Sequence, residues 1–135
     1  METLEGGCLC GRTRYRVSGT PQNLCFCHCA SCRRAAGAPL VAWGTFSRDG
    51  FHLLAGDAYV LHASSAQVQR GFCAHCGTSL SYAHAERDGE IDVTLVTLDD
   101  PARYEPECHI WVEDRLPWVR IEDGRPQYQR WRTAG

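Results

Sequence analysis

The chain is 135 residues long, which predicts a single compact domain. Hydrophobic residues make up 44% and charged residues 22%, as in soluble globular proteins, and no apolar run approaches the roughly 18 residues of a membrane-spanning helix. All 14 basic residues are arginine, which excludes a Schiff-base lysine, a pyridoxal-phosphate enzyme and a Walker-type phosphate loop, and the net charge of -2 disfavours nucleic acid as a partner.

The predicted elements are mostly short β-strands, because runs rich in β-branched and aromatic residues alternate with turn residues. One short helix is predicted at 30–36, where small residues precede Gly37. Asp49-Gly50 and Gly56-Asp57 predict hairpin turns with antiparallel pairing across them. Apolar and polar residues alternate over 91–95, which predicts a strand with one solvated face. In chain order, the predicted strands are 13–17, 40–46, 51–54, 59–62, 68–72, 79–84, 91–98 and 108–112.

No repeat or long linker interrupts the chain, so residues 1–122 are predicted to form one domain. Residues 123–135 combine arginines with Gly, Pro and Gln and are interpreted as a C-terminal tail, loosely ordered or used at a subunit contact in a homo-oligomer. The segment from Met1 to Glu5 has two acids and no basic patch before an apolar run, so we expect no secretory signal and a cytoplasmic location with reduced thiols.

Nine cysteines carry the strongest signal, and their close spacings favour metal binding over disulfides. Cys73-Ala74-His75-Cys76-Gly77 has the form of a zinc knuckle, with a glycine to relieve the turn. Cys8 and Cys10, flanked by glycines, are the candidates to complete a closed site of four thiolates. We therefore predict a structural zinc on Cys8, Cys10, Cys73 and Cys76, with the pairing inferred.

A second group holds Cys25, Cys27, Cys29 and Cys32, too many for one simple site. Alternate residues of an extended strand lie about 6.6 Å apart, so one cysteine is expected to drop out. The economical choice is Cys27, Cys29 and Cys32, which leaves the fourth position of a zinc open for catalysis. The alternative is a second structural site, closed by one of four neighbouring side chains: Cys25, Cys108, His28 or His109. Cys25 and Cys108 are otherwise interpreted as buried apolar residues.

Several side chains near this cluster have two interpretations each. Arg33 and Arg34 are candidates to hold the carboxylates of a peptide-like thiol such as glutathione, or they form a solvated helix face. His28 is either a proton shuttle or directed elsewhere, and His109 either reaches the site or is a packed structural residue. Three tryptophans are interpreted as core residues rather than a ligand platform: Trp43, Trp111 and Trp118.

A series of motifs carries a resemblance to a known family. In order they are Gly7-Cys8-Leu9-Cys10-Gly11, Cys27-His28-Cys29 with Cys32-Arg33, Gly37-Ala38-Pro39, Phe72-Cys73 with Cys76-Gly77-Thr78, Leu98-Asp99-Asp100-Pro101, His109-Ile110-Trp111 and Trp118. Between residues 6 and 118 the sequence resembles the glutathione-dependent formaldehyde-activating enzyme family, also called the GFA or CENP-V/GFA family. The resemblance implies a mostly β, Mss4-like fold of coiled antiparallel sheets, stapled by zinc.

The resemblance also implies two zinc ions, one structural and one catalytic on the residues matching Cys27, Cys29 and Cys32, the second being the more labile. Family members are typically described as carbon-sulfur lyases that act on the adduct of glutathione and formaldehyde. We therefore expect a zinc-dependent enzyme of S-hydroxymethylglutathione formation or cleavage, or of a related small thiol adduct, with no membrane partner. The alternative is a non-catalytic, zinc-stapled binding module for protein or nucleic acid.

Overall fold

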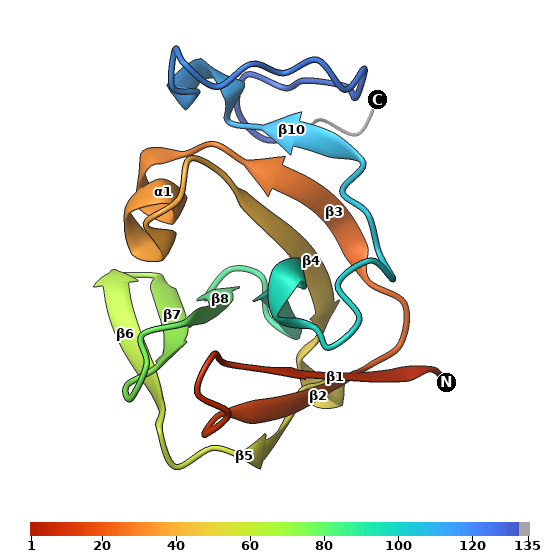
Figure 1. Cartoon of the computed structure of the whole chain (residues 1–135), viewed down its shortest axis with the longest axis vertical. Helices are drawn as coiled ribbons and strands as arrows, with labels where there is room; N and C mark the ends of the chain where they lie inside the picture. The colour runs from red at the N-terminus through yellow and green to blue at the C-terminus, as the bar shows by residue number, and fades with distance from the viewer. Residues whose placement is uncertain (133–135) are drawn as a thin grey trace.

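Two β-sheets form the framework of the computed structural model, which describes residues 1–132 (Figure 1). The smaller sheet has the strand order β1-β2-β5, and the larger has the order β10-β3-β4-β9-β8-β7-β6. The strands are β1 (Thr3–Gly7), β2 (Arg14–Ser18), β3 (Gln22–Cys27), β4 (Val41–Ser47), β5 (His52–Ala55), β6 (Tyr59–Ser65), β7 (Val68–Cys73), β8 (Ser79–His84), β9 (Glu90–Thr94) and β10 (Cys108–Ile110).

Helical structure is short, and the predicted helix is present with the predicted bounds as α1 (Ala30–Ala36). The helix ends at Gly37, whose φ of 63° is the left-handed conformation that glycine adopts most easily. Three single 3-10 turns accompany it: η1 (Arg48–Gly50), η2 (Leu95–Thr97) and η3 (Val112–Asp114). The predicted fold class, mostly β with antiparallel sheets and one or two short helical turns, is confirmed.

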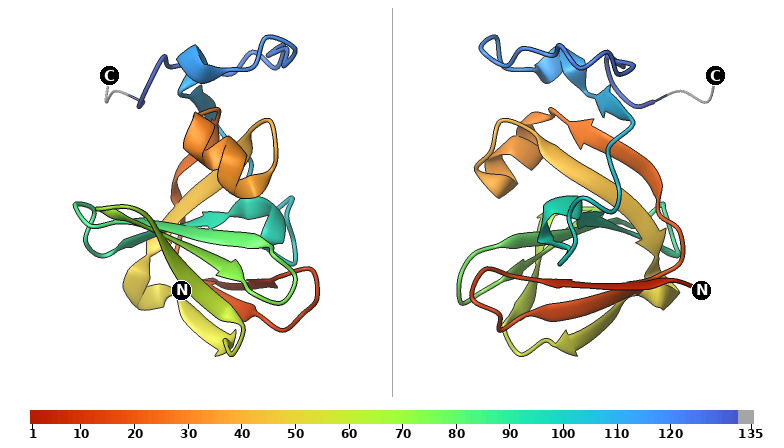
Figure 2. Two further views of the ribbon diagram at one scale, coloured as in Figure 1. Left: turned by 90° about the vertical axis from the view of Figure 1, so that its left-hand side faces the viewer. Right: turned by 45° about the vertical axis from the view of Figure 1, so that its right-hand side comes forward.

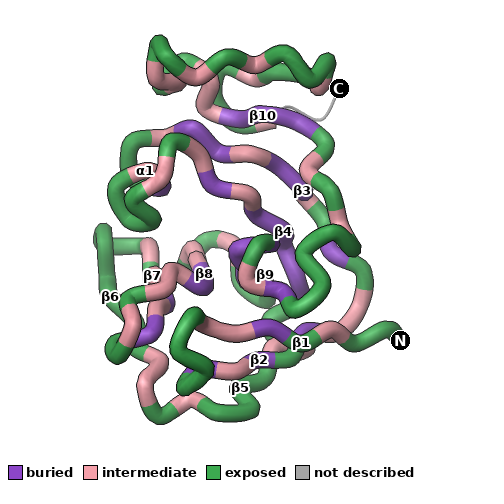
Figure 3. The backbone as a smooth tube through the Cα atoms, viewed as in Figure 1, coloured by how far each residue is buried: buried purple, intermediate pink, exposed green. Residues whose placement is uncertain are grey.

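The main core lies between the two sheets, where Tyr15 and Val17 of β2 face Phe46 of β4 and Val93 of β9. Gly6 lies in a crowded place, because a Cβ built there would lie 2.5 Å from the hydroxyl oxygen of Tyr15, on the paired strand β2, and 2.5 Å from the Thr97 carbonyl oxygen of η2. Glycine is therefore required at this position by space rather than by backbone conformation. Figure 3 shows the buried residues of β1, β2, β4 and β9 that contribute to the core between the two sheets.

A second apolar cluster surrounds the end of β3, where β4 pairs antiparallel on one side and β10 pairs parallel on the other. Cys25, Cys27 and Cys108 are buried there beside Trp43 and Ile110. The segment after η3 returns to β10, since the backbone N–H of Tyr128 donates to the His109 carbonyl and that of His109 to the Pro126 carbonyl. Of the predicted tail, residues 126–130 thus lie beside β10 and the start of η3 (Figure 2), and 133–135 are outside the described residues.

The predicted hairpins at Asp49-Gly50 and Gly56-Asp57 are wrong. β4 and β5 flank the first turn but belong to different sheets, and β5 and β6 flank the second and also belong to different sheets. Both turns are crossings between sheets, because β5 pairs with β2 while β6 pairs with β7. Local turn chemistry marks where the chain reverses and does not specify the strand that it then joins.

The predicted solvated face of β9 is also wrong, because Ile91, Asp92, Val93 and Thr94 are all buried. β9 lies between β4 and β8, and its polar side chains are paired rather than exposed to solvent. Two elements lacked a clear strand pattern and were not predicted, β1 and β3. None of the helices within residues 1–132 has the length and apolar character needed to cross a bilayer.

Phe46 offers a test of the core between the sheets, where it is 2% exposed. We expect Phe46→Ala to lower the free energy of unfolding by about 3–5 kcal/mol, because a large cavity replaces the ring. Leu61→Ala is the control, since this β6 side chain is 56% exposed and its loss should change stability by less than about 0.5 kcal/mol. Denaturant unfolding at a fixed zinc concentration measures both, and equal effects would contradict the core assignment.

Candidate functional site

The first cysteine cluster joins the β1–β2 loop to the turn between β7 and β8. The sulfurs of Cys8, Cys10, Cys73 and Cys76 all lie within 4.8 Å of one another. The Cys8–Cys10 and Cys10–Cys73 sulfur pairs are 3.6 and 3.8 Å apart, close to the roughly 3.8 Å that a tetrahedral zinc with 2.3 Å bonds imposes. The four residues therefore fit a closed zinc site that ties residues 8–10 to residues 73–76.

Hydrogen bonds to sulfur support anionic thiols in this first cluster. The backbone N–H of Thr13 donates to Cys8 Sγ over 3.3 Å, and the Thr78 hydroxyl lies 3.2 Å from Cys76 Sγ. The hydrogen bond with the Thr78 side chain is the largest of the effects that lower the pKa of Cys76 to about 5. Thr13 and Thr78 were not singled out in the sequence, because nothing in their spacing distinguishes them from ordinary turn residues.

The second cluster forms where β3 ends and α1 begins. The sulfurs of Cys27, Cys29 and Cys32 all lie within 4.8 Å of one another. Cys29 caps the helix, since its sulfur accepts a hydrogen bond from the Cys32 backbone N–H over 3.3 Å. Helix formation therefore brings Cys32 back toward the strand residues. No other histidine, cysteine or carboxylate within residues 1–132 joins these three sulfurs.

The three adjacent sulfurs affect one another's ionisation strongly. A hydrogen bond from the Cys27 thiol is the largest of the effects that lower the pKa of Cys29 to about 2. The same contact raises the pKa of Cys27 far above its ordinary value, because a second thiolate would face the first. Only a cation allows all three to ionise together, and coordination to a metal deprotonates thiols in this way. The donor set therefore fits a soft divalent ion such as zinc.

A cavity of about 370 Å³ opens over the second cluster, a volume within the usual range for small-molecule sites. Its walls come from the larger sheet, the start of α1 and the C-terminal segment. Aromatic side chains form much of the wall: Trp43, Tyr82, Trp111 and Trp131. Trp43 is thus both a buried core residue and a cavity residue, whereas Trp118 is 69% exposed and the prediction that it lies in the core is wrong.

Four residues of this cavity occupy one row across the sheet. The strand register places Arg70 opposite Tyr82, Tyr82 opposite Asp92, and Asp92 opposite Thr45. Residues paired in this way share a face of the sheet. The row therefore presents a cation, an aromatic ring, a carboxylate and a hydroxyl to the same space.

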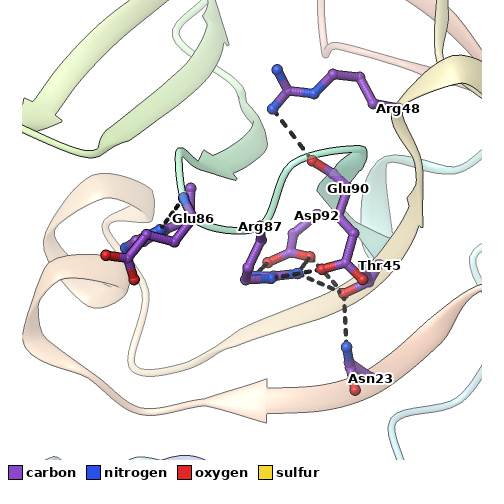
Figure 4. Close-up of polar contacts among 8 residues, drawn as sticks. Asn23, Thr45, Arg48, Glu86, Arg87, Glu90 and Asp92 are labelled. Carbon is purple, nitrogen blue, oxygen red and sulfur yellow. Dashed lines mark hydrogen bonds and ion pairs between the residues drawn. The ribbon is translucent and has the colours of Figure 1, made fainter.

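Arg87 reaches this row from the β8–β9 loop and neutralises Asp92. Its terminal nitrogens donate to the two Asp92 carboxylate oxygens over 2.8 and 3.0 Å, and Nε donates to Glu90 over 2.9 Å (Figure 4). The Thr45 hydroxyl also donates to Asp92, over 2.6 Å, and Asn23 lies 3.5 Å from the same hydroxyl. The carboxylate is thus fully engaged within the protein.

The model of the family described as "Glutathione-dependent formaldehyde-activating enzyme" matches residues 3–114. The chain belongs to this GFA family. A Halomonas elongata protein named "Putative glutathione-dependent formaldehyde-activating enzyme" is 29% identical over 136 residues, covering 88% of the chain and 81% of that relative. An uncharacterized lyase of Schizosaccharomyces pombe is 30% identical over 84 residues, covering 62% of the chain and 60% of that protein's length.

The crystal structure of a Rhodobacter sphaeroides protein shares the fold, with a TM-score of 0.61 at 18% identity. The match covers 93% of this chain and 99% of that one. The arrangement of the two sheets is therefore common to proteins whose sequences have diverged widely.

In this GFA chain the two histidines near the second cluster are turned away from the cavity. His28 Nε2 lies 2.8 Å from His109 Nδ1, and His109 Nε2 lies 2.7 Å from Asp123 Oδ2. Since the Asp123 carboxylate accepts from His109, His109 Nδ1 is left to accept from His28. Burial is the largest of the effects that lower the pKa of His28 to about 4. Neither histidine lines the cavity. The hydrogen bonds from His28 through His109 to Asp123 instead connect the loop that carries the second cluster to the C-terminal segment.

The other predicted site residues lie at varying distances from the cluster. Cys25 is buried and lines the cavity without joining the three sulfurs, and Cys108 is buried opposite it on β10. Arg33 and Arg34 do not line the cavity: Arg33 Nε donates to the His28 carbonyl, and Arg34 is exposed. Sequence reasoning missed Arg70 and Arg87, since a single arginine in a strand or loop carries no spacing signal.

Asp123→Ala tests whether the C-terminal segment stabilises the cluster loop. We expect a lower midpoint of urea unfolding, because the buried His109 ring would lose its hydrogen-bond acceptor. The hydrogen bond with His109 holds the pKa of Asp123 well below its ordinary value, so the stabilisation is present above that ordinary pKa and is lost as the pH falls below it.

Glu122→Ala is the control, because this neighbouring carboxylate makes only an exposed ion pair with Arg120. The difference between the two variants should shrink in acid. Equal stability of both variants at pH 7 would show that the His28–His109–Asp123 chain contributes little.

Proposed function

We propose that this chain is a zinc-dependent enzyme acting on the adduct of glutathione and formaldehyde, or on a closely related small thiol adduct, as a carbon-sulfur lyase. The observation that carries this proposal is the convergence of Cys27, Cys29 and Cys32 beneath a cavity, with no fourth ligand from the described chain. Three protein ligands with an open position are typical of catalytic zinc, whereas structural sites are closed. Family membership and the relatives' names support the same chemistry.

The two clusters have different roles in this proposal. Cys8, Cys10, Cys73 and Cys76 hold a structural zinc, and Cys27, Cys29 and Cys32 hold a second, more labile zinc. When bound, the second zinc favours the thiolate form of a substrate sulfur at neutral pH, since coordination deprotonates a thiol. The chain supplies the surrounding walls, which exclude water and fix the position of the substrate.

In the synthetic direction a bond forms between the glutathione sulfur and the formaldehyde carbon. The carbonyl π-bond breaks, and its oxygen takes up a proton equivalent to the one that the thiol loses. The product is S-hydroxymethylglutathione, and the reverse reaction breaks the same carbon-sulfur bond. No redox partner is required, because no electrons are gained or lost overall.

We also propose that the protein works in a reducing compartment, the cytoplasm. All nine cysteines are free thiols in the structure, including pairs of sulfurs close enough to be oxidised. Both clusters need reduced sulfur to bind zinc.

Zinc content tests the two clusters separately. Because the structure has two clusters, we expect about two zinc ions per wild-type chain. Cys76→Ser and Cys29→Ser should each lose about one, and Cys76→Ser should lower the thermal midpoint more, since the first cluster joins distant segments. Cys108→Ala, outside both clusters, is the control and should keep both ions. Elemental analysis with a thermal melt measures these quantities, and unchanged zinc in Cys29→Ser would contradict the second site.

The rate of exchange between formaldehyde, glutathione and their adduct tests the activity. Because the adduct also forms without an enzyme, carbon-13 exchange NMR should compare each sample with a protein-free reaction. We expect zinc-loaded wild type to accelerate exchange, Cys29→Ser to return it to the spontaneous rate, and Cys108→Ala to remain active. If wild type and Cys29→Ser give the same rate, the proposed function is wrong.

A further inference from the structure

Arg70 of β7 contacts the second cysteine cluster. Its two terminal nitrogens each lie 3.8 Å from Cys32 Sγ, and Nε lies 3.3 Å from the Ser64 hydroxyl. The guanidinium carbon sits 5.0 Å from the centre of the Tyr82 ring. The side chain is half-buried and lines the cavity, so its charge is held in place at the wall rather than in bulk solvent.

Arg70 has no carboxylate within ion-pair distance among residues 1–132. Arg87, the other arginine of the cavity, is paired with Asp92 and Glu90 (Figure 4). Tyr82 separates Arg70 from Asp92 in the row across the sheet, so that carboxylate does not reach Arg70. Within residues 1–132, the contacts with Ser64 and Cys32 leave further guanidinium N–H groups without an acceptor, since arginine has five.

We propose that Arg70 is a specificity-determining residue that binds a carboxylate of the thiol substrate. The inference rests on the proposed function and adds to it the group that selects an anionic thiol over a neutral one. A substrate whose sulfur joins Cys27, Cys29 and Cys32 lies beside Arg70, because Arg70 contacts Cys32. A carboxylate on the same molecule can then accept from the outer face of the guanidinium in a forked arrangement.

The charge of the second cluster favours such a group. With zinc bound, the three thiolates leave a net charge of -1 and a substrate thiolate makes it -2, so a substrate that also carries carboxylates would be repelled. Arg70 offsets this repulsion at the sulfur cluster itself. Arg33 and Arg34 cannot do so directly, because the described cavity is not lined by either of them.

Calorimetric binding of glutathione and of its diethyl ester to zinc-loaded protein tests the proposal. The ester keeps the thiol and loses both carboxylates. We expect Arg70→Met to weaken glutathione binding roughly ten- to a hundredfold, as for loss of a hydrogen bond to a charged group, while binding of the ester changes little. Arg70→Lys should give an intermediate loss, because it keeps the charge without the fork. Arg16→Met, an exposed residue of β2, is the control and should bind both ligands as wild type does.

The outcomes separate this proposal from its alternatives. Equal weakening of both ligands in Arg70→Met, or lower zinc content, would mean that Arg70 acts through Cys32, and would overturn the proposal. Unchanged glutathione binding in Arg70→Met would also overturn the proposal. So would a preference for glutathione over its ester that persists in Arg70→Met and disappears in Arg33→Gln or Arg34→Gln. If wild type does not bind glutathione, the proposed function fails, and this inference fails with it.

Discussion

Three sulfurs crowded at the end of one strand impose the main constraint on this molecule. Cys27, Cys29 and Cys32 cannot all ionise without a cation, because neighbouring thiolates repel one another in a partly buried place. They are nevertheless held together by the fold itself, since Cys29 caps the helix that carries Cys32. The fold therefore places three thiols where a single metal ion can bind all of them. The first cluster imposes a similar constraint at the C-terminal end of β7, where Cys73 is the last residue of the strand.

The surrounding architecture holds the three sulfurs from several sides. β3, which carries Cys27, is paired with β4 on one edge and with β10 on the other. β10 is in turn held by the C-terminal segment, both through backbone hydrogen bonds and through the chain from Asp123 to His28. Segments about 80 residues apart in sequence thus fix the same short loop. The C-terminal residues are part of the site, because Trp131 also lines the cavity.

The parts of this structure that follow from local chemistry could be predicted from the sequence. The helix at 30–36 has its stop signal at Gly37, and the cysteine spacings group the same residues that the structure brings together. The pairing of β5 with β2 could not be predicted, because a turn does not specify which sheet the next strand joins. The burial of Asp92 was missed for a related reason. Alternation along β9 indicates polar positions, and the partners that make burial of Asp92 possible, Arg87 and Thr45, come from other segments.

The two arginines of the cavity show why charge in a sequence does not by itself indicate function. Arg87 and Arg70 both approach the same row of side chains, yet Arg87 meets Asp92 and Arg70 meets the Tyr82 ring and Cys32. This difference arises from strand register, which places one aromatic residue between Arg70 and the carboxylate. An arginine neutralised by a buried acid stabilises the sheet, whereas an arginine stacked on an aromatic ring keeps its charge available. A one-residue change in the β7–β8 register would move Arg70 to the other face of the sheet, so the substrate preference of the cavity depends on the pairing of these two strands.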